Sequence, residues 1–273
     1  MSEKSVPDIE KSPRRWTSVY TKDELIRQLL RIQKEGWIKV RANRQAKDGG
    51  LGNTLEDLLG IPENNLPLAD YGQFELKTHR SESNSLISLF RFEPKPGRVI
   101  PKLVENYGWP FPKYGPNERS LRVDIDAAKF SERGFIARIN EELERVELHF
   151  DNSKVPRTTI YQNWLRSVKT KAGLADLNPI PYWTFADREN KIKSKIGNMI
   201  YVTVETPSKE KKMRVAKAVL LQGASLSKFL DGIKKGWLQI EINARTGHNH
   251  GTAFRTWERY WPSLYSNIEV LVE

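Results

Sequence analysis

Apolar residues recur along the chain at spacings that alternate between those of helices and those of strands. Near the N-terminus Leu25, Leu29 and Ile32 follow a helical period, and further on Leu238, Ile240 and Ile242 alternate with polar residues as in a strand. We predict helices over 22–35, 53–60, 158–170, 185–196 and 224–235. We predict strands over 37–40, 73–78, 86–90, 121–125, 134–138, 145–150, 199–205, 212–220, 237–243 and 268–272. This mixture is typical of an α/β (α+β) fold.

Other segments lack these periods. Residues 1–16 are polar and contain two prolines, which predicts a flexible tail. Residues 93–118 are rich in proline and aromatic residues, which favours a long surface loop, either facing a partner or simply packed on the core. The segments 73–78 and 86–90 are expected to form adjacent strands of one sheet.

The charge narrows the range of partners. The 273 residues carry a net charge of +11, which favours a polyanionic partner, DNA or RNA before an anionic membrane. No apolar run approaches the roughly 18 residues of a membrane span, and no signal-peptide core is evident. The absence of cysteine excludes disulfides and thiolate metal sites and fits a cytoplasmic protein.

One stretch carries candidate chemistry, Asp70-Tyr71-Gly72-Gln73-Phe74-Glu75-Leu76-Lys77. Strand side chains alternate, so Glu75 and Lys77 share one face, and a turn would bring Asp70 beside Glu75. Asp70, Glu75 and the backbone carbonyl of Leu76 could then hold Mg²⁺, while Lys77 orients or helps deprotonate a water that attacks a phosphodiester. Because charged residues are 29% of the chain, the pattern is weak by itself, and a surface ion pair is the alternative.

A carboxylate on the preceding helix could complete this site. On a helical projection Glu56 lies about 105° from the centre of the apolar face, whereas Asp57 lies about 155° away. Glu56 could therefore reach a neighbouring strand and hold a second cation or a bound water, although a structural role is common for such a residue. The basic loop before this helix, through Gly49-Gly50-Leu51-Gly52, suits either phosphate contacts or simple exposure.

The histidines near the C-terminus allow several interpretations. A zinc site at His248 and His250 would need further ligands that no cysteine or clustered histidine supplies. A loop that reads bases is more economical, because Asn243, Arg245 and Arg255 lie close by in sequence and arginine pairs with guanine edges. Phosphate contacts or ordinary surface roles remain the alternatives.

Three motifs together resemble the MvaI/BcnI family of type II restriction endonucleases, which is related to the repair nicking enzyme MutH. They are Gly49-Gly50-Leu51-Gly52-Asn53-Thr54-Leu55-Glu56-Asp57-Leu58-Leu59, then Asp70-x4-Glu75-Leu76-Lys77-Thr78-His79, and His248-x-His250-Gly251-Thr252-Ala253-Phe254-Arg255. The resemblance implies a PD-(D/E)xK fold with a mixed sheet flanked by helices and two lobes that clasp DNA. It places Glu56, Asp70, Glu75 and Lys77 on catalytic positions and His248 and Arg255 on base-reading positions.

From this resemblance we expect a catalytic lobe over 17–175 and a DNA-recognition lobe over 176–273. We expect DNA contacts from His79, Glu241, Asn243, Arg245, His248, His250 and Arg255. Glu241 and Asn243 stand where the family carries an acidic residue and an arginine, so the target sequence is expected to differ more than the chemistry.

The resemblance further implies a monomer that uses Mg²⁺, with Mn²⁺ as a substitute, and nicks each strand of double-stranded DNA in turn within a short CC/GG-flanked near-palindromic site. A DNA methyltransferase is the expected genetic partner. A MutH-like mismatch-repair nickase and a DNA-binding protein without catalytic activity are the alternatives.

Overall fold

The computed structural model describes residues 21–40, 49–60, 74–81, 86–207 and 210–273. The helices are α1 Lys22–Lys34, α2 Gly49–Leu58, α3 Val99–Tyr107, α4 Thr159–Ala172, α5 Phe185–Lys195, α6 Leu226–Lys234 and α7 Trp261–Leu264. The strands are β1 Ile38–Lys39, β2 Glu75–Arg80, β3 Ile87–Arg91, β4 Trp109–Pro110, β5 Arg119–Ile125, β6 Phe135–Asn140, β7 Arg145–Phe150, β8 Tyr182–Thr184, β9 Asn198–Glu205, β10 Lys212–Gln222, β11 Leu238–Arg245, β12 His248–Asn249, β13 Ala253–Thr256 and β14 Asn267–Val272.

The described strands form three sheets. The first sheet has the order β1-β10-β9-β2, with β14 beside β10, and β2 runs parallel to β9 while the other pairs are antiparallel. The second sheet has the antiparallel order β3-β13-β11-β5-β4, with β12 beside β11. The third sheet is β6-β7-β8. The α+β class and most predicted segments are thereby confirmed.

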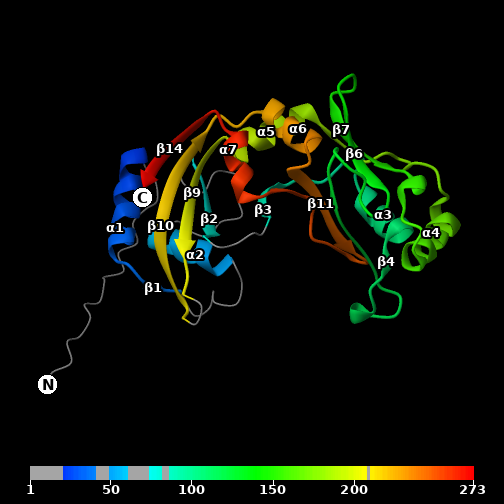
Figure 1. Cartoon of the computed structure of the whole chain (residues 1–273), viewed down its shortest axis with the longest axis horizontal. Helices are drawn as coiled ribbons and strands as arrows, with labels where there is room; N and C mark the ends of the chain where they lie inside the picture. The colour runs from blue at the N-terminus through cyan, green and yellow to red at the C-terminus, as the bar shows by residue number, and fades with distance from the viewer. Residues whose placement is uncertain (1–20, 41–48, 61–73, 82–85, 208–209) are drawn as a thin grey trace.

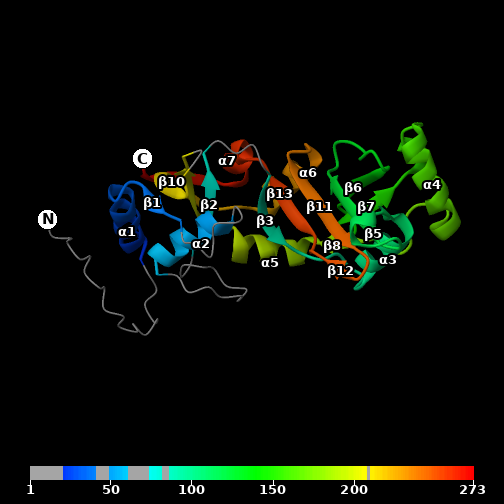
Figure 2. The ribbon, with the colours of Figure 1, turned by 90° about the horizontal axis from the view of Figure 1, so that it is seen from below.

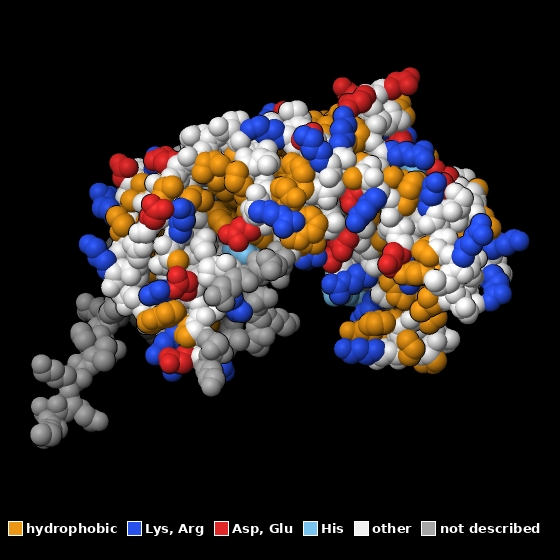
Figure 3. Space-filling model, in the orientation of Figure 1, with side chains coloured by type: hydrophobic (Ala, Val, Ile, Leu, Met, Phe, Trp, Pro, Cys, Tyr) orange, Lys and Arg blue, Asp and Glu red, His pale blue; other side chains and the backbone are white. Residues whose placement is uncertain are grey.

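The molecule is an arch (Figure 1). The first sheet, α1 and α2 form one side, the second and third sheets with α3 and α4 form the other, and α5 and α6 lie at the top between them. Figure 3 shows that the molecule is hollowed from below between the two sides, with lysine and arginine side chains at the lower end of the right-hand side.

Two hydrophobic cores stabilise this arch. The first lies between α1, α2 and one face of the first sheet, where Leu29, Leu55 and Val202 are fully buried. The second fills the other side of the arch and extends to the opposite face of the first sheet, where Met199 and Tyr201 belong to it. The first sheet is therefore covered on both faces.

The first sheet combines strands that are far apart in the sequence. The strands β9, β10 and β14 come after residue 175 in sequence, yet they build the same sheet as β2. A division of the chain at residue 175 would separate β2 from its parallel partner. The functions expected for the two lobes stay predictions.

The helix that carries Glu56 begins earlier than predicted. It starts at Gly49, and Thr54 lies inside the helix, where it is buried and donates a hydrogen bond of 2.7 Å to the carbonyl of Gly50. Leu51 and Leu55 are both buried at helical spacing. Burial of these leucines stabilises the helix by more than the glycines destabilise it. The low helix propensity of glycine, judged from the local sequence alone, therefore places the start of the helix too late.

Two further expectations were wrong. The segment 93–118 contains α3, in which Val99, Leu103 and Val104 are buried. Pro101 lies in its first turn, where the missing N–H costs no helical hydrogen bond. The strands β2 and β3 are not adjacent, because β2 pairs with β9 while β3 pairs with β13 in the second sheet.

Candidate active site and DNA-contacting surface

Glu75 is the centre of the candidate active site. It is the first residue of β2, beside Met199 of β9, and it is only 5% exposed. Lys77 Nζ donates a hydrogen bond of 2.7 Å to Glu75 Oε1, as expected for residues two apart on one strand face. Lys195 Nζ lies 3.6 Å from Glu75 Oε2, and that oxygen accepts no hydrogen bond from the residues that the structure describes.

The alternation of β2 explains why Glu75 and Lys77 share this position. Leu76 points into the core of the first sheet and is 4% exposed, so its two neighbours point to the opposite face. The predicted shared face of Glu75 and Lys77 is thus confirmed. Glu75 and Lys77 do form an ion pair, as in the alternative interpretation, and in this pair Glu75 is buried and Lys77 is partly exposed.

The structure says less about the other predicted ligands, Glu56 and Asp70. Glu56 is half-buried on α2, and α2 packs against β2, the strand that carries Glu75. Asp70 lies outside the described residues. Within the part of the chain that the structure describes, no group of three or more His, Asp or Glu residues could hold a metal ion.

The residues present fit a hard divalent cation. Among the described residues nothing donates a hydrogen bond to the buried Glu75 Oε2, and such an oxygen suits a cation that prefers oxygen ligands. Burying such an oxygen costs free energy unless a cation or donor satisfies it. Asp70, Glu56 and the Leu76 carbonyl stay predicted ligands.

His79 lies on the same face of β2 as Glu75, four residues further along the strand. Its ring stacks on Tyr201 at a centroid distance of 6.1 Å, and its side chain is 10% exposed. Its Nδ1 lies 3.2 Å from Glu258 Oε2 without forming a hydrogen bond. Burial raises the pKa of Tyr201 far above its ordinary range. The structure therefore places His79 apart from the other predicted DNA-contacting residues.

The predicted base-reading residues lie together on the second sheet. Arg255 on β13 places Nη1 3.0 Å from Glu241 Oε1 on the neighbouring β11. Across β11, Arg122 on β5 lies 3.7 Å from the same oxygen, and Asp124 is the register partner of Glu241. Burial, and then Glu241, raise the pKa of Asp124 against the opposing effect of Arg255 and Arg122.

The β11–β12 hairpin carries the remaining residues. His248 Nε2 and His250 Nδ1 are 3.3 Å apart, and the His250 amide donates to the Asn243 carbonyl at 3.0 Å. Burial lowers the pKa of His250, and the nearby His248 and Arg245 charges lower it further. At pH 7 a neutral ring leaves His250 able to donate at one nitrogen and accept at the other.

Glu93 and Arg91 form hydrogen bonds to the end of this hairpin and to the segment after it. Glu93 accepts hydrogen bonds from Asn249 Nδ2 at 3.0 Å and from the Thr252 amide at 2.7 Å. Arg91 donates to the His250 carbonyl. The histidine motif thus has a defined backbone conformation set by residues far away in sequence.

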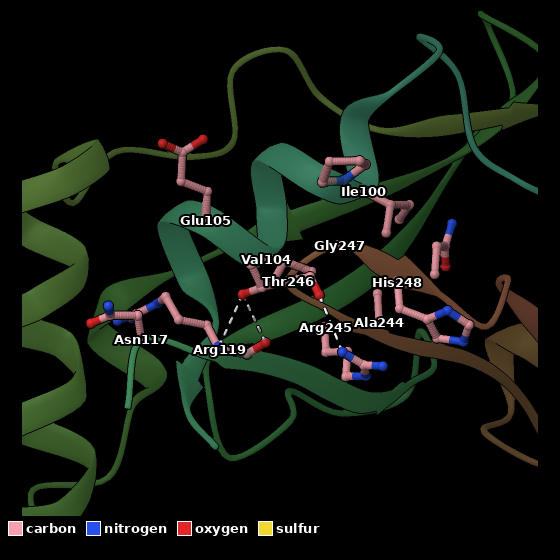
Figure 4. Close-up of a pocket in the computed structure, with 12 residues that line it drawn as sticks. Ile100, Val104, Glu105, Asn117, Arg119, Ala244, Arg245, Thr246, Gly247 and His248 are labelled. Carbon is pink, nitrogen blue, oxygen red and sulfur yellow. Dashed lines mark hydrogen bonds between the residues drawn. The ribbon is translucent and has the colours of Figure 1, made fainter. Parts of the chain in front are cut away.

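A cavity of about 640 Å³ opens beside the hairpin (Figure 4). Arg119, Arg245 and His248 line its polar side, and Ile100 and Val104 of α3 line its apolar side. The guanidinium of Arg245 stacks 4.5 Å from the centre of the Tyr114 ring and lies 3.6 Å from Glu118.

Sequence reasoning missed several residues of this surface. Arg122 and Asp124 alternate on β5, a signal that could have placed them on one face, but nothing local indicated that β5 pairs with β11. Tyr114 belongs to a segment that was expected to be irregular. Lys195 gave no local signal, because it lies 120 residues from Glu75 in sequence.

A buried carboxylate between two lysines on the first sheet, together with arginine and histidine side chains gathered on the second sheet, suits a nuclease that acts on DNA. A sequence profile of the MvaI/BcnI restriction endonuclease family matches residues 26–265. The chain belongs to this family, which makes it a restriction endonuclease and a site-specific DNA nuclease.

Solved structures support the same fold. The structure described as restriction endonuclease MvaI in complex with cognate DNA substrate is 22% identical, with a TM-score of 0.73 over 92% of this chain and 98% of that chain. The structure of MvaI in the absence of DNA is 23% identical, with a TM-score of 0.53 over 91% of this chain and 96% of that one. A comparison with curated protein sequences gives no match.

Proposed function

We propose that this protein is a type II restriction endonuclease that requires Mg²⁺ and hydrolyses double-stranded DNA at a short CC/GG-flanked near-palindromic site. We further propose that it acts as a cytoplasmic monomer that nicks each strand in turn, beside a methyltransferase that protects the host DNA. The observation that carries the proposal is Glu75, which is buried between two lysines and has one oxygen that accepts no hydrogen bond from the described residues.

The residues of the site would act as follows. Glu75, Asp70, Glu56 and the Leu76 carbonyl would hold Mg²⁺, which when bound supplies Lewis acidity toward water and phosphate. Lys77, held by Glu75 Oε1, would orient the attacking water and take part in moving its proton. The water oxygen forms a bond to phosphorus as one phosphorus–oxygen ester bond breaks, and the lysine charge offsets the negative charge that develops.

The recognition surface would read bases through the second sheet. Arg255 and Glu241 present a paired cation and carboxylate, and His248, His250, Asn243 and Arg245 add donors and acceptors along the hairpin. Such groups match the donor and acceptor pattern of base edges in the major groove. Mn²⁺ is expected to substitute for Mg²⁺.

Digestion of a sequenced plasmid tests this function. We expect the purified protein to linearise supercoiled plasmid with Mg²⁺ and no added partner, and end mapping would give the target site. Persistent nicked circles would instead indicate a repair nickase. Salt-sensitive binding without any cleavage in Mg²⁺ or Mn²⁺ would indicate a DNA-binding protein.

Substitution of Glu75 tests the assignment of the site. Glu75→Gln keeps the side-chain shape but removes the carboxylate. We therefore expect the cleavage rate to fall by about a hundredfold or more, which is the effect of losing one contact to a transition state. Lys77→Ala should have a comparable effect. Specific DNA binding, measured by gel shift in Ca²⁺, should be retained.

Glu205→Gln is the matched control, because Glu205 lies on β9 next to β2 but pairs with Arg214 outside the site. Its cleavage rate should equal that of the unsubstituted protein. Normal cleavage by Glu75→Gln would disprove the site assignment.

A further inference from the structure

The helix α5 connects the two sides of the arch. Its N-terminal turn lies on the recognition side, where Thr184 caps the helix and Asp187 pairs with Lys95 at 2.6 Å. Its C-terminal turn lies against the first sheet, where Ile192 and Ile196 are buried. In Figure 2, α5 runs beneath β3, from the side of the arch that holds β2 toward the side that holds β11. Lys195, the last residue of α5, is thereby brought to Glu75.

The backbone after α5 restricts where Lys195 can lie. A Cβ at Gly197 would come 2.6 Å from the carbonyl oxygen of Lys193, so this close turn requires glycine. The chain then enters β9, whose Met199 is the register partner of Glu75. Lys195 therefore reaches Glu75 because of the same parallel pairing that forms the site.

The two lysines beside Glu75 differ in their contacts. Lys77 donates a hydrogen bond to Oε1 at 2.7 Å, whereas Lys195 lies 3.6 Å from Oε2 and makes no hydrogen bond to it. The Lys195 ammonium thus balances the negative charge on Oε2, while none of the described residues donates a hydrogen bond to this oxygen. The Lys195 side chain is 21% exposed, so its ammonium has solvent on one side.

We propose that Lys195 is a positioning residue of the active site, which balances the charge on Glu75 Oε2 until a divalent cation takes that oxygen and DNA phosphate arrives. The proposal rests on the nuclease function proposed above. A cation at Oε2 and the ammonium repel each other in this covered position, so Lys195 competes with the metal in the absence of DNA. Once phosphate is present, its negative charge gives the ammonium a new partner.

The test measures metal binding separately from cleavage. Mn²⁺ alone is titrated into the full-length protein by calorimetry without DNA, for the unsubstituted protein and for Lys195→Gln. We expect Lys195→Gln to bind Mn²⁺ about tenfold more tightly, because a competing charge at a few ångströms has been removed. With saturating Mg²⁺ and plasmid, the same variant should cleave at least about tenfold more slowly.

Two variants separate positioning from folding and from general charge loss. Lys195→Arg keeps the positive charge and should restore weaker Mn²⁺ binding and much of the cleavage rate. Lys193→Gln removes a lysine two residues earlier on α5, which pairs with Glu189 on the surface, and should change neither quantity. Thermal melting of each variant checks that the fold is retained, and Lys195→Met serves if Lys195→Gln is unstable.

Mn²⁺ affinity that is unchanged or weaker in Lys195→Gln, or equal effects of Lys193→Gln, would overturn the proposal. These outcomes are distinguishable from failure of the nuclease function, which would appear as absence of plasmid cleavage by the unsubstituted protein.

Discussion

Arg188 is a charged residue held entirely within aromatic surroundings. It is fully buried on α5, and its guanidinium lies 4.8 Å from the Phe254 ring centre, 5.5 Å from that of Trp183 and 5.7 Å from that of Phe229. None of its nitrogens has a hydrogen-bond partner among the described residues. Burial lowers the pKa of Arg188 to about 9. Cation–π contacts offset part of this desolvation cost.

Replacing this residue should stabilise the protein. Arg188→Met removes a buried charge while filling a similar space, so we expect the free energy of unfolding at pH 7 to rise by about 1 to 2 kcal/mol. Because the folded-state pKa is depressed, the destabilisation by Arg188 is complete below about pH 9 and is relieved as pH rises through that value. Denaturant titration at pH 7 measures the difference.

Lys193→Met is the control for Arg188, since Lys193 lies on the exposed side of the same helix with a side chain 69% exposed. Its effect should stay within about 0.5 kcal/mol. A large loss of stability in Arg188→Met would show that the guanidinium makes favourable contacts that outweigh its burial.

At the scale of elements, a network of hydrogen bonds between ionisable side chains connects the third sheet to the segment between α4 and β8. His149 on β7 contacts Asp176 at 2.6 Å through Nδ1 and Glu147 at 3.0 Å through Nε2. Arg145 donates to Glu147 at 2.6 Å, and the Phe150 amide donates to Asp176 at 2.8 Å. Burial raises the pKa of both carboxyls, but these hydrogen bonds outweigh it and hold each pKa below its ordinary value.

The sign of these shifts predicts acid sensitivity. Groups whose folded-state pKa is lowered contribute stability that is present above their ordinary pKa near 4 and is lost as pH falls through the lowered values. We expect the midpoint of thermal unfolding to fall steeply below about pH 4. Asp176→Asn should reduce this slope, as measured by melting curves across the acidic range.

Asp231→Asn provides the comparison, because Asp231 pairs with Lys235 on the exposed face of α6. Its acid dependence should match that of the unsubstituted protein. An identical acid slope in Asp176→Asn would contradict the stabilising role of this contact.

At the scale of the whole molecule, the arch is built from strands that are interleaved along the chain. The candidate active site needs β2 from the first third of the sequence and β9, β10 and the end of α5 from beyond residue 184. The buried faces of β9 and β10 contribute Ile200, Val202 and Leu220 to the core with α1 and α2. No helix in the described ranges is long and apolar enough to cross a membrane.

Truncation tests this interleaving. A fragment of residues 1–175 lacks the central strands of the first sheet, so its apolar faces have no partner. We expect this fragment to lack cooperative thermal unfolding and cleavage activity, whereas the full chain shows both. Circular dichroism and the plasmid assay measure these properties. A folded, active fragment would show that the catalytic lobe is independent.

Local pattern determined most elements and part of the site. Alternation in β2 was sufficient to place Glu75 and Lys77 on one face, because this depends on backbone periodicity alone. The flank position of Glu56 on α2 stays a prediction from helical spacing. The histidine motif and the net charge indicated a DNA-acting protein, and the family match confirms it.

Only the tertiary structure decided which segments meet. The pairing of β2 with β9 brings Lys195 to Glu75, and the pairing of β11 with β5 brings Arg122 beside Glu241. The burial of Leu51 made a glycine-rich stretch helical, and α3 formed within a segment expected to be a loop. These outcomes depend on contacts between residues far apart in sequence, whose energies exceed local propensities and leave no periodic signal.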